Sequence, residues 1–460
     1  MSGLTGILDI AGGALFTSQT ELDTTAHNIA NANTEGYTRQ RVVTQASDPI
    51  QTTYGFLGTG VQVESIQGVR DSYVNEQVTN LNSDLSQANI NQQTLSSIGG
   101  IFDETSTSTS GLTSQLNAFF GALQTLSQTP EDEGVRQNVL QAGINVATTF
   151  NSLSNQLQDV KYQVAQQVTS DVSTINSLAS TIAGINKQIL ANAGTSRNSS
   201  DLQDQMNNAV SQLSNLMNVK VVTDPTGVMN VTAGGAVLVA AGNAYQFKMT
   251  QTSSGITVGR SDSTVPATVS SGELAGLVNS YDTQIPSYSA QLDNIAATFA
   301  KTINAFNSSG YTLSTNGNPP QTGGDFFQGT TAGTIQVSQN IISNLNNIAA
   351  SSSGDPGNGD NAAAMANVLN APVMSNGQSI VNAYEALVNQ VGTDSQNTGN
   401  TVQTLQVQQN QMQAFQTSIS GVSLNQELTN MIEYQHSFEA AAKVVTTADS
   451  MYQTVIGMVQ

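Results

Sequence analysis

Histidines and carboxylates are the side chains with which this sequence could do metal or acid–base chemistry, and only 2 histidines are present. His436 has Glu433 and Glu439 three residues away on either side, which places all three on neighbouring turns of one helix face. A metal site would need a further ligand and a dry pocket, and the sequence offers neither. His27 has no Ser and carboxylate in the arrangement of a triad. We therefore interpret both histidines as helix-surface or packing residues and expect no catalytic residue and no metal.

Two glycine pairs, at residues 58–60 and 234–235, are the other positions where ligand chemistry would be sought. Neither continues into a second glycine and a helix of a βαβ unit, and neither carries the Lys-Ser/Thr of a phosphate loop. We therefore expect no cofactor. The chain also has no Cys, so a disulfide framework and a thiolate metal site are both impossible. The sequence favours a protein that is not an enzyme.

Two amphipathic stretches at the ends of the chain are the elements around which the rest is organised. Apolar residues recur at alternating steps of four and three from Leu424 onward, which is the spacing of a coiled-coil seam, and residues 4–29 keep the same rhythm. Helices of this length are marginal alone in water, and the nearest partner for either seam is the other terminus. Two helices still leave outer apolar positions in water, so we expect neighbouring copies of the same protein to complete the burial. The predicted assembly interface comprises Leu4, Ile7, Leu8, Ala11, Leu15, Leu22, Ile29, Leu424, Leu428, Met431, Ile432, Phe438, Ala442, Val445, Tyr452, Val455, Ile456 and Val459.

Composition excludes several classes of partner. The 12 Lys and Arg residues stand against 32 Asp and Glu residues, for a formal net charge of −20. No basic patch is therefore available to bind nucleic acid or an anionic membrane surface. No apolar run reaches the roughly 18 residues of a membrane-spanning helix, so membrane insertion is not expected. The N-terminal residues carry no positive charge ahead of an apolar stretch and do not resemble a cleavable secretory signal.

A short run after the first helix carries a family resemblance. Residues 30–40 read Ala-Asn-Ala-Asn-Thr-Glu-Gly-Tyr-Thr-Arg-Gln, which resembles the signature of the bacterial flagellar rod, hook and hook-associated axial proteins. Segments 58–73 and 423–449 resemble the second block and the closing helix of that family. The interior runs at 272–277 and 323–327 resemble the members that join hook to filament. The signature residues are Asn31, Asn33, Thr34, Gly36, Tyr37, Arg39 and Gln40.

This resemblance implies a structural subunit of the bacterial flagellum that self-assembles through its terminal helices at the junction between hook and filament. It implies that filament assembly needs this subunit. The partners it implies are further copies of the chain, hook subunits, the next hook-associated protein on the filament side, and an export chaperone on the C-terminal helix. It also implies an extracellular position, reached through the flagellar type III apparatus without a cleaved signal peptide.

Alternatives to this interpretation come from inside and outside the family. Another axial subunit, such as a hook protein or a flagellin-like protein, is built on the same terminal helices. An exported surface interaction protein is the alternative from another class. Tyr37 and Arg39 fit two roles equally well: anchors for another molecule, or residues that pack where the chain leaves the first helix.

Hydrophobic periodicity predicts a mainly α fold with terminal coiled-coil helices, a long-helix bundle and a small β-rich insert. The predicted domains are a terminal coiled coil (1–36 and 421–460), an extended strap or joint (37–70), a helical bundle with loops (71–218 and 272–420) and an inserted β-rich domain (219–271).

Within the bundle, the longest helical pattern covers residues 146–189. The last long pattern, residues 380–419, is expected to run antiparallel to it and close the bundle. Pro286 is expected to bend or break the helix that begins near Leu274. Outer segments are expected to pair first with last, with the next segments paired inside them and both termini at one end.

Overall fold

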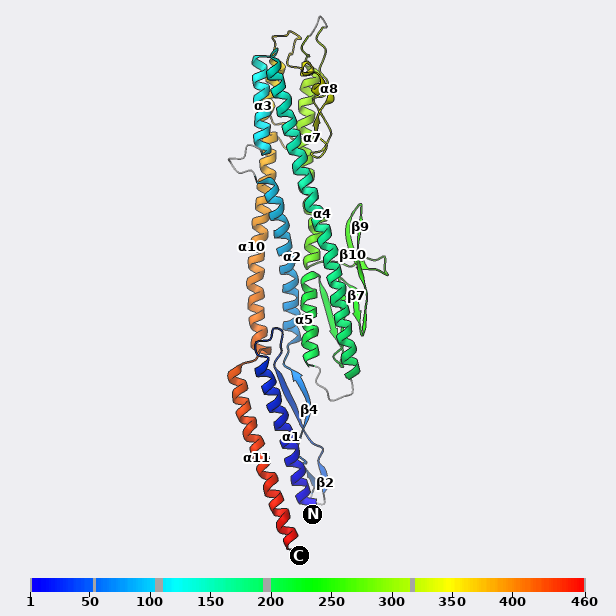
Figure 1. The fold of residues 1–460 in the computed structure, drawn as a ribbon, viewed down its shortest axis with the longest axis vertical. Helices are drawn as coiled ribbons and strands as arrows, with labels where there is room; N and C mark the ends of the chain where they lie inside the picture. Colours follow the sequence, from blue (N-terminus) through cyan, green and yellow to red (C-terminus); the bar gives the residue numbers. More distant parts are fainter. Residues whose placement is uncertain (1, 53–54, 104–110, 193–199, 315–318, 459–460) are drawn as a thin grey trace.

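The computed structural model describes residues 2–52, 55–103, 111–192, 200–314 and 319–458. These residues form a long rod of helices in which both termini lie at one end, as expected (Figure 1). The fold is mainly α-helical with a β-rich insert, which confirms the predicted fold class. The helices are α1 Ser2–Ala30, α2 Ser72–Phe102, α3 Leu112–Gln128, α4 Glu133–Asn192, α5 Ser200–Leu216, α6 Glu273–Asn279, α7 Ile285–Ser309, α8 Gln339–Ser343, α9 Asp360–Asn367, α10 Ile380–Ser420 and α11 Leu424–Gly457. The strands are β1 Gln40–Ala46, β2 Ile50–Thr52, β3 Gly55–Leu57, β4 Val61–Gly68, β5 Val219–Thr223, β6 Met229–Ala233, β7 Ala236–Ala240, β8 Asn243–Ala244, β9 Phe247–Thr252, β10 Gly255–Arg260, β11 Phe327–Gln328 and β12 Gln336–Val337.

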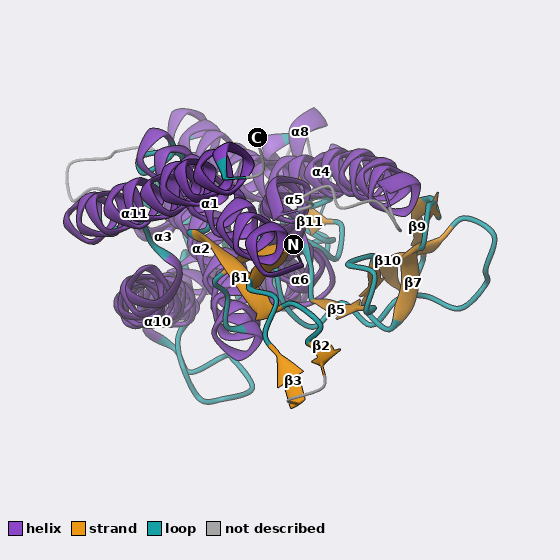
Figure 2. Cartoon of the chain, turned by 90° about the horizontal axis from the view of Figure 1, so that it is seen from below, coloured by secondary structure: helices purple, strands orange, loops and turns teal. Residues whose placement is uncertain are grey.

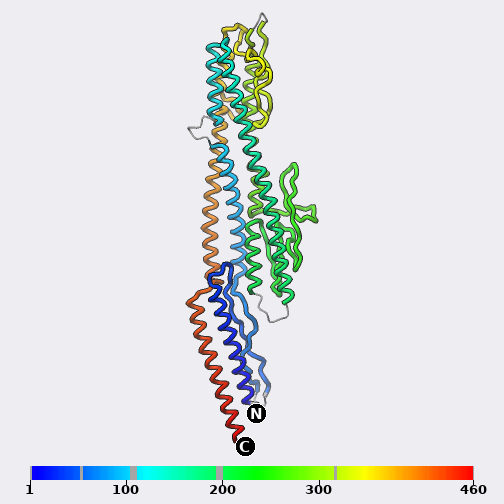
Figure 3. The backbone as a smooth tube through the Cα atoms, viewed as in Figure 1, coloured from blue at the N-terminus to red at the C-terminus, as the bar shows by residue number. Residues whose placement is uncertain are grey.

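The helices pair in a nested order. α1 lies beside α11 at the terminal end of the rod, and α2 lies along α10 in the layer beyond it (Figures 1 and 3). The expectation that the first segment pairs with the last is therefore confirmed. The expectation that α10 runs antiparallel to α4 is wrong. α2 and α3 run away from the terminal end, α4 runs back toward it, α5 and α7 run away again and α10 returns. α4 and α10 therefore both run toward the terminal end, and α2 is the antiparallel partner of α10 (Figure 1).

α4 is the longest element of the bundle, with 60 residues. At about 1.5 Å per residue it spans roughly 90 Å. Its apolar positions, repeating at three and four residues from Val139 to Ile189, are buried along the rod. At the end of the rod distant from the termini, Phe119 packs against Phe299 with ring centroids 5.6 Å apart, and Phe326 and Phe327 pack against the same ring. The Gly-Gly-Asp-Phe-Phe run is thus part of the bundle core.

Pro286 neither breaks nor ends its helix. A π-helical turn, Ser280–Gln284, lies between α6 and α7, and Pro286 sits in the first turn of α7. Proline cannot donate a backbone hydrogen bond, and its ring collides with the carbonyl of the preceding turn. The wider π turn absorbs this collision, so the helical path continues from Glu273 to Ser309.

The joint after α1 is a strap of paired strands. β1 and β4 pair antiparallel with Gln40 opposite Gly68 and Ala46 opposite Val61. The pairing shifts by one residue after Val43, which is a β-bulge. β2 and β3 form a second, shorter hairpin that leaves the strap near the N-terminus (Figure 1).

The β-rich insert consists of a four-stranded sheet in the order β5-β6-β7-β8 and the hairpin β9-β10. A turn from Asp224 to Gly227 joins β5 to β6. Two asparagines on α4 hold the insert to the bundle. Asn186 donates to the carbonyls of Met229 and Ala241 at 2.8 and 2.7 Å, and Asn176 donates to the carbonyl of Phe247 at 2.9 Å. The insert therefore lies on the flank of α4, and helices and loops form the far end of the rod (Figure 1).

Candidate functional site: the terminal helices and their joint

The contact between α1 and α11 is made by small side chains. Ala11 of α1 and Ala441 and Ala448 of α11 keep only 3, 8 and 2% of their surface exposed. Ser18 and Thr25 of α1 are also buried. The large apolar seam predicted on α11 faces α1 only in part, since Met431 and Val445 are half-buried but Leu428, Tyr452 and Ile456 are exposed. Alanines and hydroxyl side chains let the two helix axes approach closely, which leaves the larger residues on other faces.

The large apolar residues of α11 remain in water in the single chain. The exposed fraction is 51% for Leu428, 57% for Ile432 and 50% for Ile456. Of the predicted interface residues, Ala11 is buried. Those that are half-buried are Leu4, Leu8, Leu15, Leu22, Ile29, Met431, Ala442 and Val445. Those that are exposed are Ile7, Leu424, Leu428, Ile432, Phe438, Tyr452, Val455 and Ile456. Val459 lies outside the described residues.

Of the exposed large apolar residues in α1 and α11 that sequence reasoning missed, two are more than half exposed. Phe16 of α1 is 66% exposed, and Met451 of α11 is 53% exposed. Neither belongs to the four-and-three repeat that defined the predicted seam. A search for large apolar residues on the polar faces of the two helices would have found both.

Asn28 is the centre of the joint, and sequence reasoning did not single it out. Its amide nitrogen donates to the carbonyl of Gln40 at 2.9 Å and to Glu427 Oε2 at 3.0 Å. Its amide oxygen accepts from the Tyr37 hydroxyl at 2.8 Å and from the Gln40 backbone nitrogen at 2.9 Å. Both donors and both acceptor positions of this buried amide are therefore used. One side chain ties the end of α1, the first strand and the start of α11 together.

Tyr37 and Arg39 both take intramolecular positions. Burial, and then the carboxylates of Asp201, Asp204 and Glu427, raise the pKa of Tyr37 above its ordinary value. Its hydroxyl therefore stays protonated and donates to Asn28. The Arg39 backbone nitrogen donates to the carbonyl of Ser420 at 2.8 Å, and its guanidinium donates to Gln426 Oε1 at 3.2 Å. Of the two roles open from sequence, these contacts favour packing and chain direction.

The remaining signature residues shape the turn that follows α1. Asn31 donates to the carbonyl of His27 at 3.0 Å, and the Thr34 hydroxyl donates to Asn31 Oδ1 at 3.2 Å. Asn33 is exposed. Gly36 has φ +75°, and a Cβ there would lie 2.2 Å from Asn208 Oδ1 on α5. The positive φ favours glycine, and any side chain at this position would also have to displace the Asn208 side chain.

Asp204 of α5 fixes the strap to the bundle. It accepts from the Thr38 backbone nitrogen at 3.1 Å, from the Thr38 hydroxyl at 2.7 Å and from Arg70 Nη2 at 2.7 Å. Arg70 also donates to Gln203 Oε1 and, at 3.1 Å, to the carbonyl of Ser200. This largely buried ion pair therefore fixes how the terminal helices meet the bundle.

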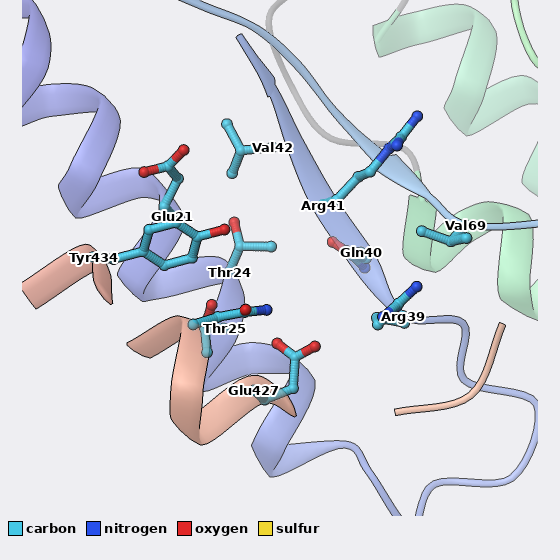
Figure 4. A pocket seen from close by; sticks show the side chains of 11 residues that line it. Glu21, Thr24, Thr25, Arg39, Gln40, Arg41, Val42, Val69, Glu427 and Tyr434 are labelled. Atoms are coloured by element: carbon cyan, nitrogen blue, oxygen red, sulfur yellow. The ribbon is translucent and has the colours of Figure 1, made fainter. Parts of the chain in front are cut away.

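A polar cavity of about 180 Å³ opens between α1, β1 and α11 (Figure 4). Its lining includes Glu21, Arg41, Glu427 and Tyr434. Burial raises the pKa of Glu21, and the nearby Glu433 carboxylate raises it further. Burial also raises the pKa of Tyr434, with smaller contributions from the carboxylates around it. The cavity has polar groups for hydrogen bonds but no nucleophile paired with a base.

The histidines take up surface positions. His27 Nε2 lies 3.5 Å from Asp201 Oδ1, and His436 Nδ1 lies 3.7 Å from Glu439 Oε2 on an exposed face. Within the part of the chain that the structure describes, no group of three or more His, Cys, Asp or Glu is placed to hold a metal ion. No helix among the described residues is long and apolar enough to cross a membrane.

Comparisons with known proteins agree with this architecture. The family model for the flagellar hook-associated protein FlgK helical domain matches residues 95–327. The model for the flagella basal body rod protein matches residues 8–38, and that for the flagellar basal body rod FlgEFG protein C-terminal matches residues 412–458. The two ends that form the joint are thus the segments shared with rod proteins.

Relatives that match over nearly the whole chain indicate which flagellar family it resembles. The flagellar hook-associated protein 1 of Bacillus subtilis is 32% identical, over 98% of this chain and 97% of the relative. The protein of the same name from Salmonella typhimurium is 26% identical, over 99% of this chain and 100% of the relative. A solved structure of the flagellar hook junction protein FlgK from Burkholderia pseudomallei shares the fold, with a TM-score of 0.63 and 17% identity over 75% of this chain and 100% of that one.

The nested terminal helices, the strap and the matched rod segments define a protein of the flagellar axial class. Within that class, the chain belongs to the flagellar hook-associated protein 1 family.

Proposed function

We propose that this chain is a structural subunit that assembles through α1 and α11 at the junction between flagellar hook and filament. The observation that carries this proposal is the row of large apolar side chains on α11 that the single chain leaves in water, with Leu424, Leu428, Ile432 and Ile456 each about half exposed at 48, 51, 57 and 50%. Exposed apolar surface of this extent marks an interaction site. Neighbouring copies and the adjoining axial subunits supply the cover.

In this proposal, one set of residues makes contacts within the chain and another set makes contacts between subunits. The small buried residues, such as Ala11, Ala441 and Ala448, bring α1 and α11 together within one chain. The large exposed residues then meet other subunits. Because helices of this length gain most of their stability from packing, the terminal helices become fully ordered only on docking. Far-ultraviolet circular dichroism and limited proteolysis test this point. Terminal helices that are protease-resistant in the free monomer would contradict it.

The same exposed surface suggests what happens before assembly. An export chaperone covers α11 in the cell, since an apolar helix face in water promotes aggregation. Export occurs through the flagellar type III apparatus, and the final position is outside the cell. The role is structural and involves no catalysis, no cofactor and no metal.

Electron microscopy of a strain that lacks this gene tests the proposed function. We expect intact hooks without filaments, and restoration of filaments when the gene is returned on a plasmid. Immunogold labelling of the complemented strain should place the chain at the tip of the hook. Filaments of normal length on the hooks of the deletion strain, or label spread over the cell surface, would reject the proposal and favour a surface interaction protein.

A further inference from the structure

The β2–β3 hairpin exposes large apolar side chains beside the N-terminal half of α1. Ile50 pairs with Leu57 in its ladder, and Phe56 pairs with Gln51. The exposed fractions are 61% for Ile50, 75% for Phe56 and 62% for Leu57. Since a two-stranded hairpin is marginally stable in water on its own, a hairpin that also exposes three large apolar side chains gains stability from a partner.

An apolar groove of about 190 Å³ lies between α1 and α11. Its lining residues are all apolar: Ile7, Ile10, Ala11, Ala14, Ala441 and Val444. Four of them come from one stripe of α1, at steps of three and four residues. Val444 is 45% exposed and Ile7 is 41% exposed, so the groove is open to solvent in the single chain.

The hairpin and the groove lie at the same level of the rod but on different sides of α1. Gly60, at the base of the hairpin, packs so closely on α1 that a Cβ there would lie 3.3 Å from Cα of Ile10. Ile10 also lines the groove. Both views place α11 and the hairpin on different sides of α1 (Figures 1 and 2). The hairpin therefore does not fill the groove of its own chain. It lies at the same height along the rod as the groove of a neighbouring copy placed beside it.

We infer that the β2–β3 hairpin of one copy docks in the α1–α11 groove of the next copy. This inference rests on the proposed function and names the residues by which neighbouring subunits recognise one another. Residues 50–57 carry no charged side chain, and neither do the six residues that line the groove. A chain with a formal net charge of −20 therefore meets its own copy at this contact without like-charge repulsion. Hairpin and groove are different surfaces, so the contact is head-to-tail and repeats from copy to copy.

The absence of Cys from the chain permits a direct cross-linking test. Phe56→Cys and Val444→Cys are introduced together, and flagella isolated from the complemented deletion strain are treated with a short bismaleimide. We expect a ladder of covalent multimers that extends beyond the dimer, because a head-to-tail contact links every copy to the next. Each single variant should give no covalent multimer. The matched control is Phe56→Cys with Val407→Cys, since Val407 is 66% exposed but lies on α10.

Several outcomes would overturn the inference. One is the absence of a ladder in flagella that contain normal amounts of the double variant. Dimers from Phe56→Cys alone would indicate a hairpin-to-hairpin contact, and products that contain another axial protein would indicate docking between layers. Each of these leaves the chain at the junction, so the proposed function would stand. If Phe56→Cys itself abolished filaments, recovery in Phe56→Leu would support an apolar contact, and failure to recover would count against it.

Discussion

Asn28 near the end of α1 donates a hydrogen bond of 3.0 Å to Glu427 near the start of α11, across 399 positions of sequence. Asn28 is 1% exposed and Glu427 is 2% exposed. A buried carboxylate is costly unless donors satisfy it. The first and last helices are thus joined by a polar contact that only their correct pairing satisfies.

Replacement of Asn28 by Ala should weaken this pairing strongly. The substitution removes the Asn28 hydrogen bonds to the Glu427 carboxylate, the Tyr37 hydroxyl and the Gln40 backbone. Unpaired buried polar groups cost about 1–3 kcal/mol each, so we expect a loss of roughly 2–4 kcal/mol in docking. Retention of the chain in isolated hooks, measured by immunoblot during a urea wash, should fall at least tenfold. Gln19→Ala, on an exposed position of α1, is the matched control and should leave retention unchanged.

Replacement of Gly36 by Ala should disturb the joint at the turn between α1 and β1. The backbone there has φ +75°, and the new methyl group would collide with the Asn208 side chain. We expect a cost of about 1–3 kcal/mol and faster protease cleavage in the strap. Gly58→Ala is the control, because a Cβ at Gly58 meets nothing within 4 Å. Equal cleavage rates in the two variants would show that the turn after α1 tolerates a side chain.

Arg70 should not be replaceable by Lys. An ammonium group keeps the charge opposite Asp204 but cannot reach Gln203 and the Ser200 carbonyl as well. We expect a loss of about 1–2 kcal/mol and faster hydrogen exchange of the β1 amides in Arg70→Lys. Arg41→Lys, at an exposed position of the same strap, should leave exchange as it is. Unchanged β1 exchange in Arg70→Lys would mean that the charge alone holds the strap.

The bundle contains a buried carboxyl group that should make its stability depend on pH. Burial, and to a lesser degree Glu273, raise the pKa of Asp171 to about 6. Its Oδ2 has no hydrogen-bond partner among the described residues, whereas its Oδ1 accepts from Gln167 at 2.8 Å. Because the folded-state pKa is above the unfolded value of about 3.9, the folded state binds more protons between these values. The contribution of Asp171 to the free energy of unfolding is therefore fully present below about pH 4, and it is lost as the pH rises through 6.

Asp171→Asn removes this dependence. We expect the variant to exceed the unsubstituted chain in stability by about 1–3 kcal/mol at pH 7.5, with the difference shrinking toward pH 4.5. Urea unfolding followed by circular dichroism at both pH values measures the effect. Asp159→Asn, at an exposed position of α4, is the control. A difference between variant and native chain that is the same at both pH values would contradict the titration of Asp171.

Much of the fold followed from hydrophobic spacing. Steps of three and four residues located α4, α10 and the terminal helices. The direction of α10 did not follow, because periodicity gives the buried face of a helix but not the helix on which it packs. The π turn before Pro286 was also missed, since a helix can absorb a proline without changing the apolar repeat around it.

The site was harder to predict than the fold. The pattern identified the apolar positions of α11 but assigned them to the contact with α1, where Ala441 and Ala448 lie instead. Small residues give a weak hydrophobic signal even when they form the closest helix contact. Asn28 was missed because one polar residue in an amphipathic helix looks like a surface residue until its partner, 399 positions away, is placed beside it.

Assembly through the exposed apolar face of α11 is central to the proposed function. The amount of chain retained at the hook–filament junction tests it most directly. In the deletion strain, one chain carries Leu428→Ser, Ile432→Ser and Ile456→Ser, and a matched chain carries Val222→Ser, Val265→Ser and Val407→Ser at residues that are 59, 71 and 66% exposed elsewhere. The amount of each chain in isolated hooks is measured by immunoblot. We predict that the α11 variant is reduced at least tenfold and that its hooks lack filaments, while the matched variant behaves as the unsubstituted chain. Normal amounts of the α11 variant on hooks with normal filaments would contradict assembly through this helix.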